Sequence, residues 1–387
     1  TLQLPCPSIF EGWVSFSLLF PHNSLMNVLQ EIFNDHYEEM HYLLHPRKAV
    51  IENVDKMLNC GEVSFGGAMY ICDKCGNYKF VPFRCHSRFC PTCGNMYSID
   101  RTTSMSFKLV YCKHRHCVFT IPEDLRHFFL EDRSLLNCLF SAVQSVVLRM
   151  FYKENKSESF TPGFISVLHT FGRDLKWNPH IHCLISEGAS GKHTAWRRFD
   201  HFNFTFLRFA FRTALLNILH EKLGDSFKPT KALIYRITPD GFYVGRPVIA
   251  TSRIDSYDGD TVTFHYNRHE DNKLITESIP ALDFIERLIR HIPEKHFKMI
   301  RYYGIYARHR ESDKRIHRAI SKEKHHILLS FNKWRPSILS SFGYDPLKCQ
   351  HCGNTMSILE IYYNHKPVSL QELYEKTMAK HACRSPA

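Results

Sequence analysis

Two short stretches that carry three histidines are the residues best suited to chemistry. Residues 164–170 read Phe-Ile-Ser-Val-Leu-His-Thr, and residues 177–186 read Trp-Asn-Pro-His-Ile-His-Cys-Leu-Ile-Ser. Both alternate as half-buried strands do, and the turn-forming residues between them predict an antiparallel hairpin. Pairing across that turn places His169 opposite His180, and His182 shares their face because strand side chains repeat every two residues.

Converging imidazoles are a common ligand set for a divalent metal ion. A lone buried histidine is more often a hydrogen-bonded core residue, but a His-x-His pair that faces a third histidine favours a metal site. Nitrogen ligands suit Mn²⁺, Mg²⁺ with added oxygen ligands, or Zn²⁺. We therefore expect His169, His180 and His182 to bind a divalent ion.

Two Cys-x-x-Cys pairs, each followed by glycine, form a second candidate site. The pairs are Cys72 with Cys75 and Cys90 with Cys93. Glycine lets backbone amides turn tightly toward thiolate sulfur, and four thiolates make a closed tetrahedral zinc site. We expect these four cysteines to hold one structural Zn²⁺, with Cys85 as a substitute ligand.

Basic and aromatic side chains are mixed around those cysteines. Arg84 and Arg88 lie among Tyr78, Phe83 and Phe89, a mixture that suits phosphate and base contacts. We expect the two arginines to contact nucleic acid. The alternative is that the aromatic residues only pack a small module with little other core.

A run of tyrosines and arginines over residues 297–310 supplies a candidate nucleophile. On a helix Tyr302 and Tyr306 share one face, as do Tyr303 and Tyr306, although Gly304 costs a helix about 1 kcal/mol relative to Ala. A phenol with its ordinary pKa near 10 attacks poorly unless cations stabilise the phenolate and a metal polarises the phosphate. The neighbouring cations are Arg301, Arg308 and Arg310. The alternative is simple stacking of tyrosine on arginine.

A third Cys-x-x-Cys pair, Cys349 and Cys352, supplies half of a zinc site near the end of the chain. The candidates to complete it are His351, His365 and Cys383. The alternative is that this pair binds no metal.

Composition narrows the class of protein. The 387 residues carry 50 Lys and Arg against 38 Asp and Glu, a net charge of +12, which is typical of proteins that bind a polyanion. No apolar run reaches the length of about 18 residues that spans a membrane, and no Lys or Arg precedes Arg47 to open a signal peptide. In an intracellular protein the 14 cysteines favour metal ligation over disulfides.

Hydrophobic periodicity predicts an α+β fold. Helices are expected over residues 26–44, 135–151, 204–223 and 282–292, and strands over 117–121 and 260–267 in addition to the hairpin. Long helices that alternate with strands, at least two of them antiparallel, indicate an α+β sandwich.

The order of these motifs resembles the IS91-type transposases with their N-terminal zinc-binding domain. The resemblance rests on the cysteine pairs and on residues 116–126, 167–172, 178–185 and 300–304, and it extends from about Met26 to His365. It implies a HUH (His-hydrophobic-His) single-strand endonuclease fold, in which helices flank a central antiparallel sheet with the HUH strand in its middle. It also implies rolling-circle transposition through a covalent 5′-phosphotyrosine intermediate.

The resemblance assigns roles to residues. His180 and His182 match the metal pair, which would hold catalytic Mg²⁺ or Mn²⁺. Tyr302 and Tyr306 fit the spacing of two-tyrosine members, whereas Tyr303 falls where single-tyrosine members keep theirs. The implied partner is DNA, either single-stranded or at transposon ends, and the implied location is the bacterial cytoplasm, in association with the nucleoid and with no membrane.

One departure from the family supports a different hypothesis. One sequence motif ends at Val244 and the next begins at Gly245, so the two are adjacent, whereas the family has a longer stretch between them. An internal deletion would leave a decayed transposase that only binds DNA through its zinc module. A rolling-circle replication initiator or relaxase is a further alternative, which the N-terminal zinc module disfavours.

The motifs also predict the domain organisation. We expect a non-native or unstructured leader over residues 1–25 and a zinc-binding module over 26–103. A catalytic domain should follow over 104–312, with a basic C-terminal region over 313–387.

Overall fold

The computed structural model describes residues 27–62, 65–110, 112–154, 158–199, 201–245, 253–268, 271, 273–307, 335–336, 338–339, 343–363, 366–369, 371 and 375. Backbone contacts divide the chain into two compact units. The larger unit comprises Glu38–Ile51 and Ser98–Tyr344, and the smaller unit comprises the remaining segments, up to Tyr37, Glu52–Tyr97 and from Asp345 onward.

A six-stranded antiparallel sheet forms the centre of the larger unit. Its strands are β11 (Ile300–Gly304), β4 (Thr161–Phe171), β5 (Trp177–Ser190), β3 (His114–Phe119) and β7 (Val244–Gly245) in that order, with β6 (Arg197–Arg198) paired to β5. Strand β5, which carries the His-x-His pair, therefore lies in the middle of the sheet.

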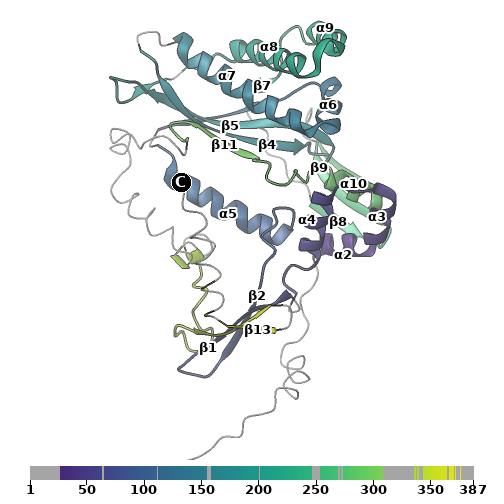
Figure 1. Ribbon diagram of the computed structural model, residues 1–387, viewed down its shortest axis with the longest axis vertical. Coiled ribbons are helices and arrows are strands. Elements are labelled where there is room, and N and C mark those ends of the chain that lie inside the picture. The colour runs from purple at the N-terminus through teal and green to yellow at the C-terminus, as the bar shows by residue number, and fades with distance from the viewer. Residues whose placement is uncertain are drawn as a thin grey trace, which may run out of the picture. The chain divides into compact units, whose positions relative to one another are not determined.

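Two long helices cover one face of this sheet (Figure 1). They are α7 (Leu136–Glu154) and α8 (Phe204–Leu223), and the short helices α6 (Arg126–Glu131) and α9 (Lys228–Ile237) lie beside them. Helix α8 begins where the side chain of Asn203 accepts a hydrogen bond from the Phe206 amide, and it ends at Gly224, whose φ of 72° favours glycine. The segment Arg133–Lys153 is long and apolar enough to cross a membrane, but it is largely buried in the core under the sheet.

The rest of the larger unit contains a second, smaller sheet. Strands β8 (Arg253–Tyr257), β9 (Thr261–Asn267) and β10 (Leu274–Pro280) pair in the order β10-β9-β8 and pack against α10 (Ala281–Ile289). The helix α3 (Tyr37–Leu44) precedes α4 (Lys48–Leu58), which runs from this unit into the smaller one. The described elements thus confirm an α+β fold.

The smaller unit is built around a four-stranded sheet with the order β13-β12-β1-β2. Its strands are β1 (Gly67–Ile71), β2 (Tyr78–Pro82), β12 (Ser357–Tyr363) and β13 (Lys366–Val368), and its helices are α2 (Val28–Asp35) and the first turns of α5 (Pro91–Lys108). Strand β12 pairs with β1 although almost 300 residues separate them. Strands β12 and β13, near the end of the chain, thus belong to the same unit as β1 and β2.

Two secondary-structure predictions are wrong. The run over residues 26–44 forms two helices, because the backbone at His36 leaves helical geometry. The tyrosine run forms strand β11 and a turn, because residues 300–304 pair with β4 and Gly304 has a φ of 58°. Residues 1–25 and the stretch 246–252, which bear on the expected leader and deletion, lie outside the described residues.

Candidate functional site

The register of the β4–β5 hairpin brings the three histidines together. His169 pairs with His180, and Val167 pairs with His182. Residues directly opposite in an antiparallel pair point to the same face, so His169, His180 and His182 share one face of the sheet. This is the register expected from the sequence, and it is confirmed.

The ring nitrogens of these histidines lie within 4.8 Å of one another. His180 Nε2 lies 3.1 Å from His182 Nε2, and His180 Nδ1 donates a hydrogen bond of 2.6 Å to the Asn178 carbonyl. That bond fixes the tautomer of His180 and leaves its Nε2 lone pair directed into the cluster.

The environment keeps the three rings neutral. Burial lowers the pKa of His169 to about 4 and that of His182 to about 3, and the neighbouring histidines lower both further. Burial also lowers the pKa of His180. A metal ligand must be unprotonated, so the rings are ready to bind an ion at neutral pH. Because every donor in the cluster is nitrogen, the set fits Mn²⁺ better than Mg²⁺, which prefers oxygen.

His116 on β3 extends the cluster and was missed from the sequence. Its Nε2 lies 2.9 Å from His182 Nδ1, the ring nitrogen that faces away from His180. His116 shares the histidine face because Val118, two residues along β3, pairs with His182. The His-x-His spacing of His114 and His116 on the neighbouring strand was the available signal, but only the β3–β5 register gives it meaning.

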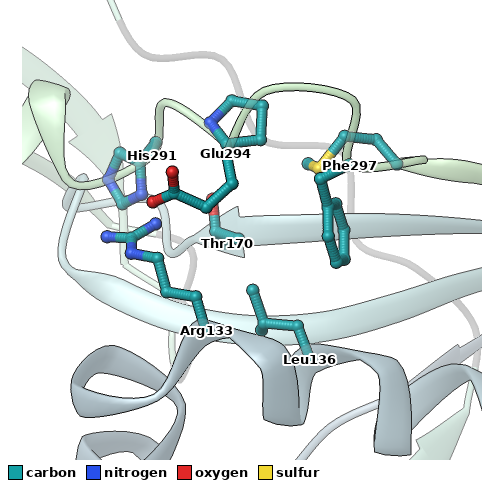
Figure 2. Close-up of a pocket in the computed structure, with 8 residues that line it drawn as sticks. Arg133, Leu136, Thr170, His291, Glu294 and Phe297 are labelled. Carbon is teal, nitrogen blue, oxygen red and sulfur yellow. The ribbon is translucent and has the colours of Figure 1, made fainter. Parts of the chain in front are cut away.

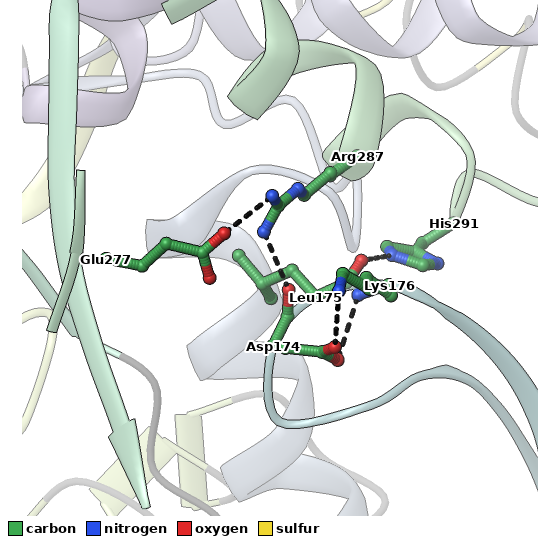
Figure 3. A network of polar contacts seen from close by, with 6 residues as sticks. All are labelled: Asp174, Leu175, Lys176, Glu277, Arg287 and His291. Carbon is green, nitrogen blue, oxygen red and sulfur yellow. Dashed lines mark hydrogen bonds and ion pairs between the residues drawn. The ribbon is translucent and has the colours of Figure 1, made fainter. Parts of the chain in front are cut away.

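Polar contacts from other elements hold the turn between β4 and β5 (Figure 3). Arg287 on α10 donates to the Asp174 carbonyl at 3.2 Å and pairs with Glu277 on β10 at 2.7 Å. His291 Nε2 donates to the Leu175 carbonyl at 2.7 Å, and Leu175 has a φ of 60°. The small sheet and α10 therefore fix the hairpin that carries the histidines.

Tyr302 lies on the same face as the histidines. On β11 it pairs with Ile165, which is two residues from Val167, the partner of His182. Its hydroxyl lies 3.5 Å from Met105 Sδ. Of the tyrosines on β11, Tyr302 is thus the one directed to the histidine side.

Tyr303 points to the opposite face. Its ring stacks on Phe164 with centroids 4.8 Å apart and packs against the core under α7. Burial raises the pKa of the Tyr303 phenol. The core position removes Tyr303 from the side of the sheet where the histidines lie.

Tyr306 follows β11 and returns to the histidine face. Its ring lies over Gly163, where a Cβ would come within 2.7 Å of it. Its hydroxyl lies 2.6 Å from His114 Nε2 and accepts a bond of 3.3 Å from the Val110 amide. His114 Nδ1 lies 3.0 Å from the Cys112 carbonyl and donates to it. His114 Nε2 therefore carries no hydrogen and accepts the hydrogen bond from the Tyr306 hydroxyl. Burial raises the pKa of Tyr306.

The arginines expected to contact DNA are scattered. Arg301 alternates with Tyr302 on β11 and so lies on the helix face, where its guanidinium stacks 3.9 Å from the Phe140 ring centroid and donates to Asn137. It therefore does not flank Tyr302, because one residue of shift reverses the face. Arg88 lies over the Tyr97 ring at 5.7 Å, Arg84 lies near Gly61, and Arg308 and Arg310 lie outside the described residues.

The cysteines form two clusters instead of the single site expected from the sequence. One cluster contains Cys60, Cys85, Cys90 and Cys93, and the other contains Cys72, Cys75, Cys349 and Cys352. The expected grouping of Cys72 and Cys75 with Cys90 and Cys93 is wrong, because the β1–β2 hairpin carries the first pair to β12 while the second pair opens α5. Cys85 is a full member of the first cluster, and Cys60 was missed.

Both clusters have the donor set and spacing of structural zinc sites. In the first, Cys60 Sγ lies 3.5 Å and Cys85 Sγ lies 3.6 Å from Cys93 Sγ. In the second, the Cys352 amide lowers the pKa of Cys349 to about 6 and the Cys75 amide lowers that of Cys72, whereas desolvation and the neighbouring cysteines raise the pKa of Cys75 to about 12. Four cysteine sulfurs at this spacing suit Zn²⁺. His365 and Cys383, expected as further ligands, lie outside the described residues.

A small pocket on the helix side of the sheet is not a site for substrate (Figure 2). It is lined by Arg133 in the turn before α7, by Leu136 at the start of α7, and by residues of the loop before β11 such as His291 and Phe297. Its volume of about 10 Å³ is near that of a single water molecule.

Comparisons with known proteins give a consistent family. The family model "Transposase zinc-binding domain" matches residues 32–121, and the model "Putative transposase" matches residues 163–237 and 241–313. No solved structure matches the chain significantly.

Two curated relatives are transposases by name. The "Transposase for insertion sequence element IS801" of Pseudomonas savastanoi pv. phaseolicola is 29% identical over 300 residues, which cover 67% of this chain and 71% of the relative. The "Putative transposase y4qJ" of Sinorhizobium fredii is 25% identical over 292 residues, which cover 65% of this chain and 73% of the relative. With its zinc-binding domain followed by a transposase domain, the chain belongs to the IS91-type transposase family.

Proposed function

We propose that this transposase cleaves and rejoins single-stranded DNA in rolling-circle fashion, with Tyr302 as the first nucleophile and the histidine cluster as its metal site. One observation carries the proposal: Tyr302 shares a sheet face with His169, His180 and His182, whereas Tyr303 is packed on the other face. A nucleophile and the group that activates its target must reach the same phosphate. This arrangement supports the proposal of a HUH-type endonuclease.

The chemistry follows from what each side chain can do. The Tyr302 hydroxyl loses its proton as its oxygen attacks the phosphorus, the bond from phosphorus to the 3′ oxygen breaks, and the 3′ oxygen takes up one proton and leaves as a 3′-OH. A divalent ion bound by His169, His180 and His182 would supply polarisation of the phosphate oxygens. The phosphotyrosine conserves the energy of the broken bond, so a later 3′-OH can displace Tyr302 without ATP.

Tyr306 fits the role of a second tyrosine. It lies four residues after Tyr302 on the same side of the sheet, and its hydroxyl already donates to His114. A neutral imidazole fixed by the Cys112 carbonyl is placed to take the phenolic proton during a second attack. If the two attacks alternate between Tyr302 and Tyr306, one protein molecule can carry out both steps of strand transfer.

DNA is the substrate that the family implies, and the net charge of +12 suits it. We propose that the zinc-binding unit contacts DNA through Arg84 and Arg88. We expect the protein to act in the bacterial cytoplasm, where the nucleoid DNA is.

A cleavage assay on single-stranded DNA tests this function. We expect the purified protein with Mn²⁺ to give a protein-linked band from 3′-labelled DNA on a denaturing gel, more strongly than with Mg²⁺. His180→Ala and His182→Ala should reduce that band at least tenfold and leave DNA binding nearly unchanged, because phosphate contacts lie elsewhere. His201→Ala, at an exposed histidine outside the cluster, is the matched control.

Failure to form a linked band with any divalent ion, in protein that still binds DNA, would refute catalysis by Tyr302. It would favour the alternative of a decayed transposase that only binds DNA.

A further inference from the structure

The last described strands of the chain complete the zinc-binding unit. Strand β12 pairs with β1 from Gly67–Tyr362 to Ile71–Ser357, and β13 pairs with β12. The knuckle that precedes β12 carries Cys349 and Cys352, and the knuckle between β1 and β2 carries Cys72 and Cys75. The pairing of β1 with β12 therefore brings the two knuckles together.

The two knuckles repeat one sequence and one backbone fold. They read Cys-Asp-Lys-Cys-Gly-Asn over residues 72–77 and Cys-Gln-His-Cys-Gly-Asn over residues 349–354. In each, the first cysteine amide donates to the asparagine carbonyl, at 2.9 Å and 2.7 Å, and the glycine amide donates back to the first cysteine, at 2.8 Å and 2.9 Å.

Both knuckle glycines adopt a left-handed backbone. Gly76 has a φ of 68° and Gly353 has a φ of 75°, a region that residues with a side chain rarely adopt. The match in sequence, hydrogen bonds and φ shows that both knuckles are shaped to present a pair of sulfurs, which are arranged as two halves of one site.

The sulfur distances fit a metal centre and not disulfides. Cys72 Sγ lies 3.4 Å from Cys352 Sγ, and Cys75 Sγ lies 3.7 Å from Cys349 Sγ. A disulfide would need about 2.05 Å, whereas thiolates around a tetrahedral Zn²⁺ at about 2.3 Å lie close to the observed separations. Asn77 Nδ2 also lies 3.8 Å from Cys349 Sγ, so the first knuckle donates toward a sulfur of the second.

Among the described residues, apolar packing at this end of the unit is small. The apolar cluster at the knuckles consists of Cys72, Cys349 and Met356, with only Tyr70 and Cys352 packed beside it. A core of that size cannot fix strands that lie so far apart in sequence, and small modules of this kind depend on a metal.

We propose that Cys72, Cys75, Cys349 and Cys352 bind a second structural Zn²⁺ that fastens the C-terminal strands to the N-terminal zinc-binding unit. Cys349 and Cys352 lie outside the stretches that either family model matches. The zinc-binding unit is then a two-zinc unit in which Cys60, Cys85, Cys90 and Cys93 form the other site. The larger unit, from Ser98 to Tyr344, is inserted between the two halves of the second site.

Zinc counting in single and paired variants tests the assignment. Cys349→Ser and Cys72→Ser should each lose one Zn²⁺ per chain relative to the unaltered full-length protein. Together they should still lose only one, because both changes remove the same site. Cys60→Ser combined with Cys349→Ser should lose two. Cys138→Ala, at a buried cysteine on α7 outside both clusters, should lose none.

The paired variants also define the results that would contradict the proposal. If Cys72→Ser and Cys349→Ser together lose two ions, or if Cys349→Ser alone loses none, the shared site does not exist. Cys352→His keeps a zinc ligand and should retain the ion, which separates loss of ligation from general misfolding.

A second measurement needs no variant. Cys75 is exposed, so iodoacetamide can reach it as a free thiol. Desolvation and hydrogen bonds with the neighbouring cysteines raise its pKa to about 12, so alkylation is compared at one alkaline pH with and without a chelator. We expect it to resist alkylation in the native protein and to become reactive on addition of a chelator, together with Cys72, Cys349 and Cys352. Rapid alkylation of Cys75 before chelation would overturn the proposal.

Discussion

His116 contacts the histidine cluster, which we propose as a metal site, from outside the ligand set. It contacts the nitrogen of His182 that points away from the cluster, and such partners fix the ring orientation and tautomer of a ligand. His116 is exposed, so solvent reaches the cluster on that side. We regard it as a positioning residue for His182.

Replacement of His116 tests this role by metal affinity. His116→Ala should weaken Mn²⁺ binding about tenfold to a hundredfold, measured by calorimetric titration of the purified protein. His116→Gln, which can accept a hydrogen bond from His182 Nδ1, should recover most of the affinity. Equal affinity in all three proteins would show that the contact has no role in the site.

For single residues, the sequence predicted the site residues that lie within one hairpin and missed those that come together only through tertiary contacts. His169, His180 and His182 follow from the two-residue repeat of paired strands. Cys60 has no cysteine partner nearby in sequence, and it reaches Cys85 and Cys93 only because α4 ends beside them. The two adjacent Cys-x-x-Cys pairs suggested one site by proximity along the chain, whereas the fold pairs the first of them with residues 349–352.

The β4–β5 hairpin owes its geometry to elements that follow it in the chain. His291, in the segment after α10, donates to the turn and stacks on Trp177 with the rings 6° from parallel. Burial lowers the pKa of His291 to about 4. The folded protein therefore keeps His291 neutral under conditions in which the unfolded chain protonates it.

Stability should consequently fall as the solution becomes acidic. Above the ordinary histidine pKa near 6.5 both states are unprotonated and the stabilisation is fully present; it is lost as pH falls from about 6.5 to about 4, by an amount on the order of 3 kcal/mol for His291. His291→Gln can keep a donor toward Leu175 without titrating, so it should flatten this dependence in urea unfolding of the protein.

The comparison with His201→Gln, a change at an exposed histidine, controls for a general effect of removing an imidazole. An unchanged slope in His291→Gln, with the control also unchanged, would mean that His291 does not couple folding to pH. His169 and His182 add to the slope in the same direction, so His291→Gln should reduce it without abolishing it.

Among helices and strands, strong hydrophobic periodicity predicted the type of element, whereas the tyrosine run did not. Helix α8 spans Phe204–Leu223, as its apolar spacing predicts. Residues 300–304 contain neither a clear helical nor a clear alternating pattern, and their strand conformation comes from pairing with β4. That pairing decides which tyrosine faces the histidines, so the sequence could not make the choice.

For the whole molecule, we expect the positive charge to dominate the free energy of DNA binding. We expect DNA binding to weaken steeply between about 50 and 200 mM salt, because phosphate contacts release counterions. Arg84→Ala and Arg88→Ala should each reduce the slope of log K against log salt by about 1. Arg301→Ala, at a guanidinium that stacks on Phe140 and donates to Asn137, should leave the slope unchanged.

Filter binding or fluorescence anisotropy at a series of salt concentrations gives these slopes. A salt dependence that is flat, or that changes only in Arg301→Ala, would move the DNA contacts away from the zinc-binding unit.

We propose that the covalent intermediate forms at Tyr302, on the histidine face of the sheet. The direct measurement is the protein-linked band from 3′-labelled single-stranded DNA on a denaturing gel, with Mn²⁺, for Tyr302→Phe, Tyr303→Phe and Tyr306→Phe side by side. Each change removes one hydroxyl and keeps the ring, and Tyr303→Phe preserves the stacking on Phe164.

We expect that Tyr302→Phe loses the band from the first cleavage while still binding DNA, that Tyr303→Phe keeps it, and that Tyr306→Phe keeps the band but stops completed transfer. Loss of the band in Tyr303→Phe with its retention in Tyr302→Phe would rule out Tyr302 as the nucleophile, because it would place the reaction on the face of the sheet away from the histidines.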